Sequence, residues 1–302
     1  MDKVLIFGIN GFSGKHFQDY IVRNKLNESW DIIGADKEID NYCNALRYVK
    51  TDLSAYENIE KLMLAEKPAY IINLIGIFHS EDLDFLININ ANITFKLLDI
   101  IVKNKIAIKK LLLVGTAAEY GISDKLPIRE DYDLRPVNFY GLSKVVQYEY
   151  MLFYKNNHGI NLNLARTFNV VGKGLSPYLS ISSFVKQCRN AKDGDTIYVG
   201  NLSTKRDFLD IDDVVDGYWK ILMHGKSGEV YNVCCGESFF IKDILNYLIE
   251  KAGKKVTVAV KDEFVKKNDI ADSYGDNSKL IKDTGWSVKS DFWKALERMY
   301  NS

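Results

Sequence analysis

Short apolar runs alternate along the first 120 residues with segments that carry apolar residues at helical spacing. The run at residues 4–9 is followed by such a segment, with Phe17, Tyr20 and Ile21 on one face. This pattern predicts a strand, a tight turn and a helix at the start of the chain. Further apolar runs predict strands at residues 31–35, 46–50, 69–76 and 110–114.

Helices are expected between most of these strands. Ser54 and Glu57 have the spacing of a capping box, which predicts the start of one helix, and residues 84–104 form another that is apolar on more than one face. The resulting order, β-α-β-β-α-β-α-β, predicts an α/β protein with a doubly wound parallel sheet of Rossmann type. No apolar run approaches the length of a membrane span.

The alternation stops after Arg166, where the pattern predicts a helix at 184–191, a strand at 196–199 and a helix at 213–223 capped by Asp212 and Asp213. We expect residues 1–168 to form a dinucleotide-binding domain, with a return strand and helix around 205–223 left open. Residues 169–302 would form a smaller, interwoven C-terminal substrate domain.

Charge balance and cysteine spacing limit the kinds of partner and site that we expect. Lys and Arg number 40, as do Asp and Glu, and this balance offers no argument for a nucleic-acid or membrane partner. The four cysteines, two of them the neighbours Cys234 and Cys235, have neither the spacing of a disulfide framework nor that of a metal site. We therefore expect reduced thiols, a cytoplasmic protein and no metal.

Three glycines in the first turn have the spacing of a dinucleotide-binding loop. Gly8 allows a sharp turn, Gly11 lets the backbone approach a pyrophosphate, and Gly14 lets helix and strand pack closely. The phosphates would lie on free N–H groups at the start of the helix. The alternative is a glycine-rich turn of any α/β protein. The expected contact residues are Gly8, Asn10, Gly11, Phe12, Ser13 and Gly14.

An acid at the end of the second strand bears on the choice of dinucleotide. Asp36 follows Gly8 by 28 residues, and a carboxylate there accepts the ribose hydroxyls and repels a 2′-phosphate. This favours NAD(H), while Lys37 beside it leaves NADP(H) possible. Asp52 and Leu53 follow the third strand, where such a sheet meets an adenine.

Tyr140 and Lys144 lie four residues apart, on one face of an expected helix. A lysine ammonium favours the phenolate of a nearby tyrosine and can hold a nicotinamide ribose, so the tyrosine can act as a general acid or base. Tyr247 and Lys251 share this spacing but lie among apolar residues of a late amphipathic segment. We interpret that second pair as structural.

In these features the chain resembles the extended short-chain dehydrogenase/reductase family, in its nucleotide-sugar branch. The resemblance covers nearly the whole chain. It rests on Gly8-x-x-Gly11-x-x-Gly14, Asp36, Asp52-Leu53, Asn73-Leu74, Asn90, residues 115–121, Tyr140-x-x-x-Lys144, and residues 166–172, 200–202, 206–208 and 275–279. It implies a triad in which Thr116 holds the sugar oxygen, Tyr140 exchanges a proton and Lys144 tunes Tyr140. Hydride would pass between nicotinamide C4 and the sugar.

The resemblance also implies further contacts and a homodimer. Cofactor contacts would include Leu74, Ile75, Gly76 and Asn90. Substrate contacts would include His79, Thr116, Ala117, Ala118, Asn169, Lys186, Arg189, Arg206 and Lys266. For Lys186 and Arg189 the alternative is a solvated basic helix face. The helices at 84–104 and 140–158 would form the dimer contact.

Ala118 bears on the reaction. Dehydratases of the branch carry an acid at this position, and epimerase/reductases of the fucose-synthase type carry a cysteine. The segments 116–121, 134–137 and 168–169 are most similar to the GDP-4-keto-6-deoxy-mannose reductases. The expected function is NAD(P)H-dependent reduction of a nucleotide-linked 4-keto sugar. A C4 epimerase or dehydrogenase with tightly bound NAD, or a non-catalytic dinucleotide sensor, remains as an alternative. The base, the sugar and the C4 stereochemistry stay open.

Overall fold

Within residues 1–40, 42–265 and 269–302, which the computed structural model describes, a seven-stranded sheet forms the centre of the larger lobe. Its strands are all parallel and run in the order β11-β6-β5-β4-β1-β2-β3. This confirms the predicted Rossmann-type sheet. The strands are β1 (Lys3–Phe7), β2 (Asp31–Asp36), β3 (Arg47–Lys50), β4 (Tyr70–Asn73), β5 (Lys110–Thr116), β6 (Leu162–Thr167) and β11 (Val230–Val233).

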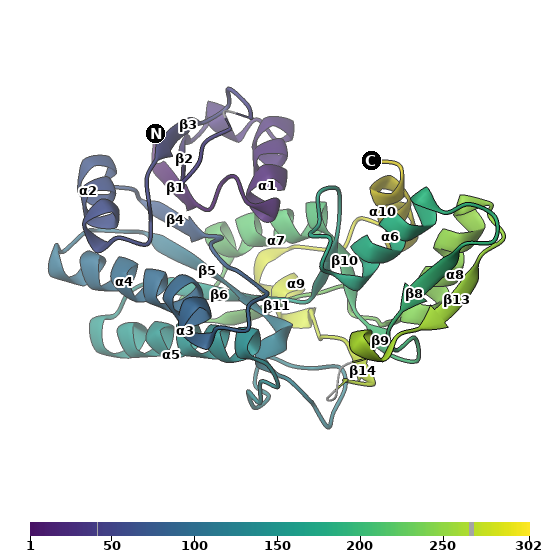
Figure 1. Cartoon of the computed structure of the whole chain (residues 1–302). Helices are drawn as coiled ribbons and strands as arrows, with labels where there is room; N and C mark the ends of the chain where they lie inside the picture. The colour runs from purple at the N-terminus through teal and green to yellow at the C-terminus, as the bar shows by residue number, and fades with distance from the viewer. Residues whose placement is uncertain (41, 266–268) are drawn as a thin grey trace.

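Helices cover both faces of this sheet (Figure 1). On one face α1 (Phe12–Arg23) packs against α7 (Ile211–His224), and α9 (Ser278–Thr284) packs against α7 and β11. The other face carries α2 (Tyr56–Glu66), α4 (Ile93–Lys103) and α5 (Phe139–His158). Because each strand contributes side chains to both layers, the strands are apolar runs rather than alternating ones.

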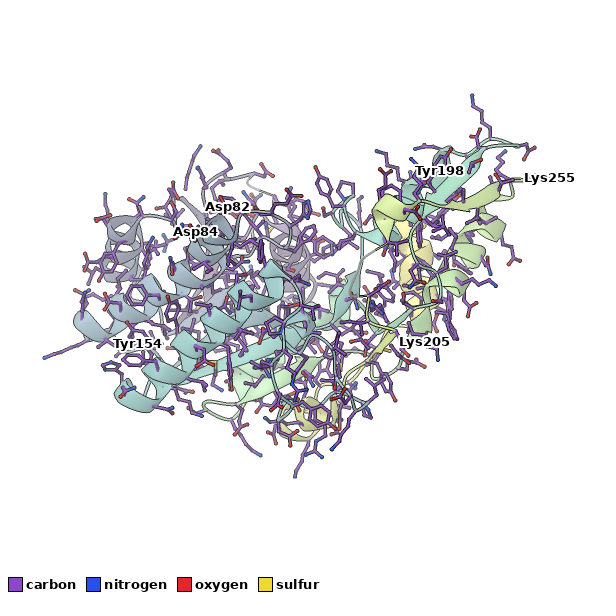
Figure 2. The ribbon with its side chains drawn as sticks, turned by 60° about the horizontal axis from the view of Figure 1, so that its bottom comes forward. Asp82, Asp84, Tyr154, Tyr198, Lys205 and Lys255 are labelled. Carbon is purple, nitrogen blue, oxygen red and sulfur yellow. The ribbon has the colours of Figure 1, made fainter. Side chains whose placement is uncertain are left out.

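The smaller lobe has its own apolar cluster, built around α6 (Ser180–Asn190), α8 (Ile241–Ala252) and α10 (Phe292–Tyr300). Figure 2 places Tyr198 and Lys255 at the outer tip of this lobe, far from Asp82 and Tyr154 on the larger one. Its short strands pair as β8 (Thr196–Val199) with β13 (Thr257–Val260), β7 (Asn169–Val171) with β10 (Phe208–Asp210), and β9 (Lys205–Arg206) with β12 (Phe239–Phe240) and β14 (Asp272–Ser273).

The two halves of the chain interweave. Helix α7 does return to the large sheet, but the strand that returns with it is β11, later than the 205–223 segment left open above. Strands β9 and β10 of that segment lie in the small sheets instead. The division at residue 168 stays a prediction.

Two predicted helix caps were wrong. Helix α2 begins at Tyr56 after Ala55, and no side chain caps it within the described residues. The N–H of Ser54 donates instead to Asp52, so this serine closes a loop rather than opening a helix. Helix α7 is capped by Asp210. The Asp213 carboxylate turns away and accepts two N–H groups from residues 289 and 290.

By length and composition alone the helix Leu83–Lys103 is long and apolar enough to cross a membrane, although polar residues interrupt its apolar stretches and half of its apolar window is buried in the protein. It consists of α3 (Leu83–Ile87), a π-helical turn η2 (Asn88–Asn92) and α4. It packs on α2 and α5, and a core helix of a globular protein passes the same test.

Gly121 and Gly159 allow a matched test of backbone packing. Both have left-handed φ angles, +61° and +66°, but a Cβ on Gly121 would lie 1.8 Å from the carbonyl oxygen of Arg135, whereas Gly159 has open space. Gly159→Ala should cost about 1 kcal/mol of unfolding free energy, from the left-handed conformation alone. Gly121→Ala should cost about 2 kcal/mol more, because the backbone must move. Urea unfolding measures both, and equal losses would contradict the close approach at Gly121.

Candidate active site

The glycine turn between β1 and α1 has the geometry of an anion cradle. Gly8 has a φ of +79°, and its N–H donates to the carbonyl of Ala35 at 2.9 Å. A Cβ on Gly14 would lie 2.3 Å from the carbonyl oxygen of Ile9, so only glycine lets α1 start this close to the strand. Gly11 is the N-cap, and no side chain caps the helix in the described chain. Its first N–H groups therefore suit the pyrophosphate of a dinucleotide.

Asp36 ends β2 beside this turn. Its two carboxylate oxygens accept the N–H groups of Asn10 at 3.0 Å and Lys37 at 2.7 Å. The Lys37 ammonium lies 3.8 Å from Asp52, not on Asp36. Hydrogen bonds from Ser54, together with Lys37, lower the pKa of the Asp52 carboxyl. An anionic Asp36 in this position suits ribose hydroxyls better than a 2′-phosphate.

The loop after β4 brings several expected cofactor residues together. A Cβ on Gly8 would lie 3.2 Å from the nitrogen of Ile75 and 3.3 Å from the carbonyl carbon of Leu74. A Cβ on Gly76 would lie 3.2 Å from the Lys144 ammonium. Asn90, in the π-helical turn, fixes the position of this loop. It accepts the N–H of Ile77 at 2.7 Å and donates to the carbonyl of Ile77 at 2.8 Å.

Thr116 and Tyr140 lie together at the carboxyl end of β5. Thr116 ends the strand and accepts the N–H of Ala118 at 3.2 Å, so Ala117 and Ala118 form a tight turn over it. Tyr140 lies in the first turn of α5, which Asn138 caps. A Cβ on Gly141 would lie 2.4 Å from the carbonyl of Ala118, and this close approach holds the helix start against the turn.

Burial shifts the pKa values of Tyr140 and Lys144, the two ionisable α5 side chains of this region. It raises the pKa of Tyr140 to about 12, against a hydrogen bond from Thr116 that lowers it. It lowers the pKa of Lys144 from 10.5 to about 8, against the charge of Glu119 that raises it. The Lys144 ammonium donates to the carbonyl of Val114 at 2.9 Å and to Gln147 at 3.0 Å. Burial has the largest effect on Tyr140, so its net pKa rises, and the expected tuning of Tyr140 by Lys144 stays a prediction.

The expected substrate residues are more scattered. The His79 ring stacks on Tyr178, with centroids 5.5 Å apart, which joins the loop after β4 to the loop before α6. Asn169 donates to the carbonyl of Asp207 at 2.9 Å. Arg206 pairs with Asp269 at 2.8 Å, and burial lowers its pKa against the attraction of that carboxylate. Lys266 lies outside the described residues.

Lys186 and Arg189 lie elsewhere on the smaller lobe. They line a cavity of about 330 Å³ between α6, α10 and the 174–177 loop, and Arg189 donates to the carbonyl of Ser302 at 2.6 Å. The described lining of that cavity does not include Thr116, Tyr140 or Lys144. Both cations are exposed, as the solvated-face alternative expects.

Sequence reasoning missed several residues of this region. Ser143 accepts a hydrogen bond from Asn90 at 2.9 Å, and Gln147 shares the Val114 carbonyl with Lys144. Ser143 follows Tyr140 by three residues, and Gln147 follows Lys144 by three. This spacing could have indicated them, since residues three apart share a helix face. Glu119 and Arg166 form a buried ion pair behind Thr116, and adjacent motifs alone do not reveal that contact.

A family model described as "NAD dependent epimerase/dehydratase family" matches residues 4–234. The chain belongs to this family. Membership confirms the expected resemblance and the expected class of enzyme, an NAD(P)-dependent oxidoreductase that acts on nucleotide sugars.

Two relatives align over almost their whole length. GDP-6-deoxy-D-talose 4-dehydrogenase of Aggregatibacter actinomycetemcomitans is 28% identical, with 99% of this chain and 97% of the relative covered. GDP-6-deoxy-D-mannose reductase of Pseudomonas aeruginosa is 27% identical, with 97% and 94% covered.

Two solved structures share the fold. RMD from Pseudomonas aeruginosa, complexed with NADPH, has a TM-score of 0.86 at 24% identity, with 100% of this chain and 98% of that chain covered. UDP-glucuronic acid 4-epimerase from Bacillus cereus, in complex with UDP-glucuronic acid and NAD, has a TM-score of 0.87 at 22% identity, with 99% and 98% covered. At these identities the likeness shows the fold alone.

The lowered pKa of Lys144 predicts a pH-dependent stability. Between about pH 8 and 10 the unfolded chain binds a proton at this lysine that the folded protein has lost, so stability rises with pH. Relative to Lys144→Met, the wild type should gain about 1 kcal/mol of unfolding free energy per pH unit in this window. Urea unfolding followed by circular dichroism at several pH values measures the difference. Lys25→Met, at a lysine whose side chain is 74% exposed, is the control and should give a flat difference. Parallel curves for wild type and Lys144→Met would contradict the burial of a charge-bearing amine.

Proposed function

We propose that the protein reduces a nucleotide-linked 4-keto sugar at C4, with GDP-4-keto-6-deoxy-mannose or a close relative as substrate. The observation that carries the proposal is the grouping of Thr116, Tyr140 and Lys144 beside the glycine turn, at the carboxyl edge of the parallel sheet. Ligands of such sheets bind at this edge. NAD(P)H supplies the hydride when it is bound, and Asp36 favours NAD(H) over NADP(H).

The ionisation of the site supports the reducing direction. With a pKa of about 12, Tyr140 keeps its phenol proton at neutral pH, as a general acid toward a forming alkoxide requires. The Thr116 hydroxyl would orient the sugar oxygen beside it. Lys144, with a pKa of about 8, stays mostly protonated and would hold the nicotinamide ribose.

The GDP-linked substrate is supported by two relatives. Both proteins, at 28% and 27% identity, are named for GDP-linked 6-deoxy sugars, one for oxidation at C4 and one for reduction. Ala118 supports simple redox, since it leaves that position without an acid for elimination or a thiol. In this proposal Arg206 exchanges part of its contact with Asp269 for the diphosphate, which a guanidinium fork matches well.

A C4 epimerase with tightly held NAD is the second candidate. It is favoured by the family, which includes epimerases, and by the fold shared with a UDP-glucuronic acid 4-epimerase. The same triad would then first take a proton from the C4 hydroxyl. It would return the proton after the 4-keto sugar has rotated to present its other face to the cofactor. Product analysis separates the two candidates.

Tyr140→Phe tests the proposal. It should lower turnover by about 10³-fold, because the general acid is lost, while NADH affinity stays close to wild type. The assay follows nicotinamide absorbance with 4-keto sugars linked to GDP, UDP, dTDP and CDP, and product NMR reports C4. Tyr247→Phe, at the other tyrosine with a lysine four residues on, is the matched control and should keep full activity. Wild-type rates in Tyr140→Phe would rule out the mechanism, and C4 inversion without net absorbance change would favour the epimerase.

We also propose a cytoplasmic homodimer that joins through α3, α4 and α5. Several large apolar side chains are exposed on these helices: Phe85, Phe95, Phe139, Leu142 and Phe153. A second copy would cover this apolar face. The four cysteines are unpaired, which suits a reducing compartment.

Phe153→Glu tests the dimer. Phe153 is 55% exposed on α5, so a buried carboxylate there should weaken association by about 100-fold or more without unfolding the monomer. Light scattering after size-exclusion chromatography measures the mass. Val260→Glu, at a residue 59% exposed on the smaller lobe, is the control and should remain dimeric. An unchanged dimer in Phe153→Glu would contradict this interface.

A further inference from the structure

A buried ion pair lies directly behind the proposed triad. Glu119 stands in the 3₁₀ turn η3 (Ala117–Glu119) after β5, and Arg166 lies on the neighbouring strand β6. Arg166 Nε donates to Glu119 Oε2 at 2.7 Å, and the two side chains are 1% and 0% exposed. Desolvation of two charges offsets most of their attraction, so such a pair adds little stability that packed apolar residues would not add. Its position suggests a different role.

The other carboxylate oxygen of Glu119 acts on Thr116. Oε1 accepts the N–H of Thr116 at 2.8 Å, while the Thr116 hydroxyl accepts the N–H of Ala118 at 3.2 Å. The two bonds form a capping box that fixes both the backbone and the side chain of Thr116. Because the hydroxyl oxygen is engaged as an acceptor, its proton is left to donate toward Tyr140 or a sugar oxygen. A Cβ on Gly115 would lie 2.4 Å from Oε1, so glycine there makes room for the carboxylate.

Arg166 extends the same contact to the helix that carries the rest of the triad. Its guanidinium carbon lies 4.6 Å from the ring centroid of Tyr148 and 4.9 Å from that of Tyr120. Tyr148 is on α5, one helical turn after Lys144 and two after Tyr140. The guanidinium also donates to the Tyr120 hydroxyl and to the carbonyl of Glu130, both at 3.3 Å. One buried pair thus touches the strand end, the turn and the helix.

We infer that Glu119 and Arg166 are positioning residues, which hold the Thr116 hydroxyl in register with the α5 side chains Tyr140 and Lys144. The inference rests on the proposed function, since it assigns the pair a part in the same reaction. The charge of Glu119 also opposes the effect of burial on Lys144 and raises the pKa of that lysine, which keeps its ammonium charged. Neither residue touches the reacting atoms.

Glu119→Ala is the main test. It should lower kcat for GDP-4-keto-6-deoxy-mannose by about 100-fold, the effect of a small misplacement of a catalytic group, with the KM for the sugar little changed. Glu119→Gln keeps an acceptor for the Thr116 N–H and should lose only about tenfold, so it also serves if Glu119→Ala does not fold. In a Thr116→Ala background Glu119→Ala should cost little more, because the pair acts through Thr116.

Asp216→Asn is the matched control. Asp216 is another buried carboxylate, and it accepts the Tyr20 hydroxyl at 2.9 Å and pairs with Lys289, away from the triad. It should lower Tm while kcat stays at the wild-type value. Amide hydrogen exchange at Thr116 gives a readout without turnover. Protection there should be lost in Glu119→Ala and kept in Asp216→Asn.

The outcomes separate the two ideas. A folded Glu119→Ala variant with wild-type kcat, or with a loss that adds fully to that of Thr116→Ala, overturns the positioning role while the loss of activity in Tyr140→Phe still supports the proposed function. Wild-type activity in Tyr140→Phe overturns the proposed function itself. Retained protection of the Thr116 amide in Glu119→Ala overturns the positioning role in either case.

Discussion

The parallel register of the central strands is the constraint on which the site depends. Phe7 of β1 lies opposite Asn73 of β4, and Thr116 of β5 lies opposite Thr167 of β6. Since these strands run in one direction and end at one edge, the glycine turn, the Gly76 loop and Thr116 meet there although Gly8 and Thr116 are more than a hundred residues apart in the sequence. Right-handed crossovers through buried helices leave little freedom for any other arrangement.

The smaller lobe is tied to that edge by a second constraint. The buried carboxylate of Asp207, just after Arg206, accepts N–H groups of Cys235 at 2.8 Å, Gly236 at 3.0 Å and Gly275 at 3.3 Å. Burial raises the pKa of Asp207 to about 7, against these three hydrogen bonds. Because Cys235 and Gly236 follow β11 of the large sheet, this carboxylate sets where Arg206 lies relative to the sheet edge.

Much of the larger lobe could be predicted for two reasons. Its strands are buried on both faces and are therefore apolar runs, and the glycines of its first turn stand where a Cβ would lie too close to the backbone. The strand predicted at 196–199 agrees with β8 as well. The pattern could not predict features that depend on tertiary contacts. Asp210 caps α7 in place of Asp213, because the Asp213 carboxylate accepts the N–H of Lys289, 76 residues later in the chain. The π-helical turn that presents Asn90 leaves no periodic signal, and the Glu119–Arg166 pair joins residues 47 positions apart.

Burial, Glu119 and Thr116 together set the protonation states of Tyr140 and Lys144 on α5. Desolvation disfavours the phenolate and the ammonium alike, so it raises the pKa of Tyr140 and lowers that of Lys144. At Lys144 the effect of burial favours the neutral amine. The Glu119 carboxylate opposes it at Lys144, and the Thr116 hydroxyl limits the rise at Tyr140. Near neutral pH both groups then carry their protons, which is the state that the proposed function requires of Tyr140 as a proton donor and of Lys144 as a charged ribose contact.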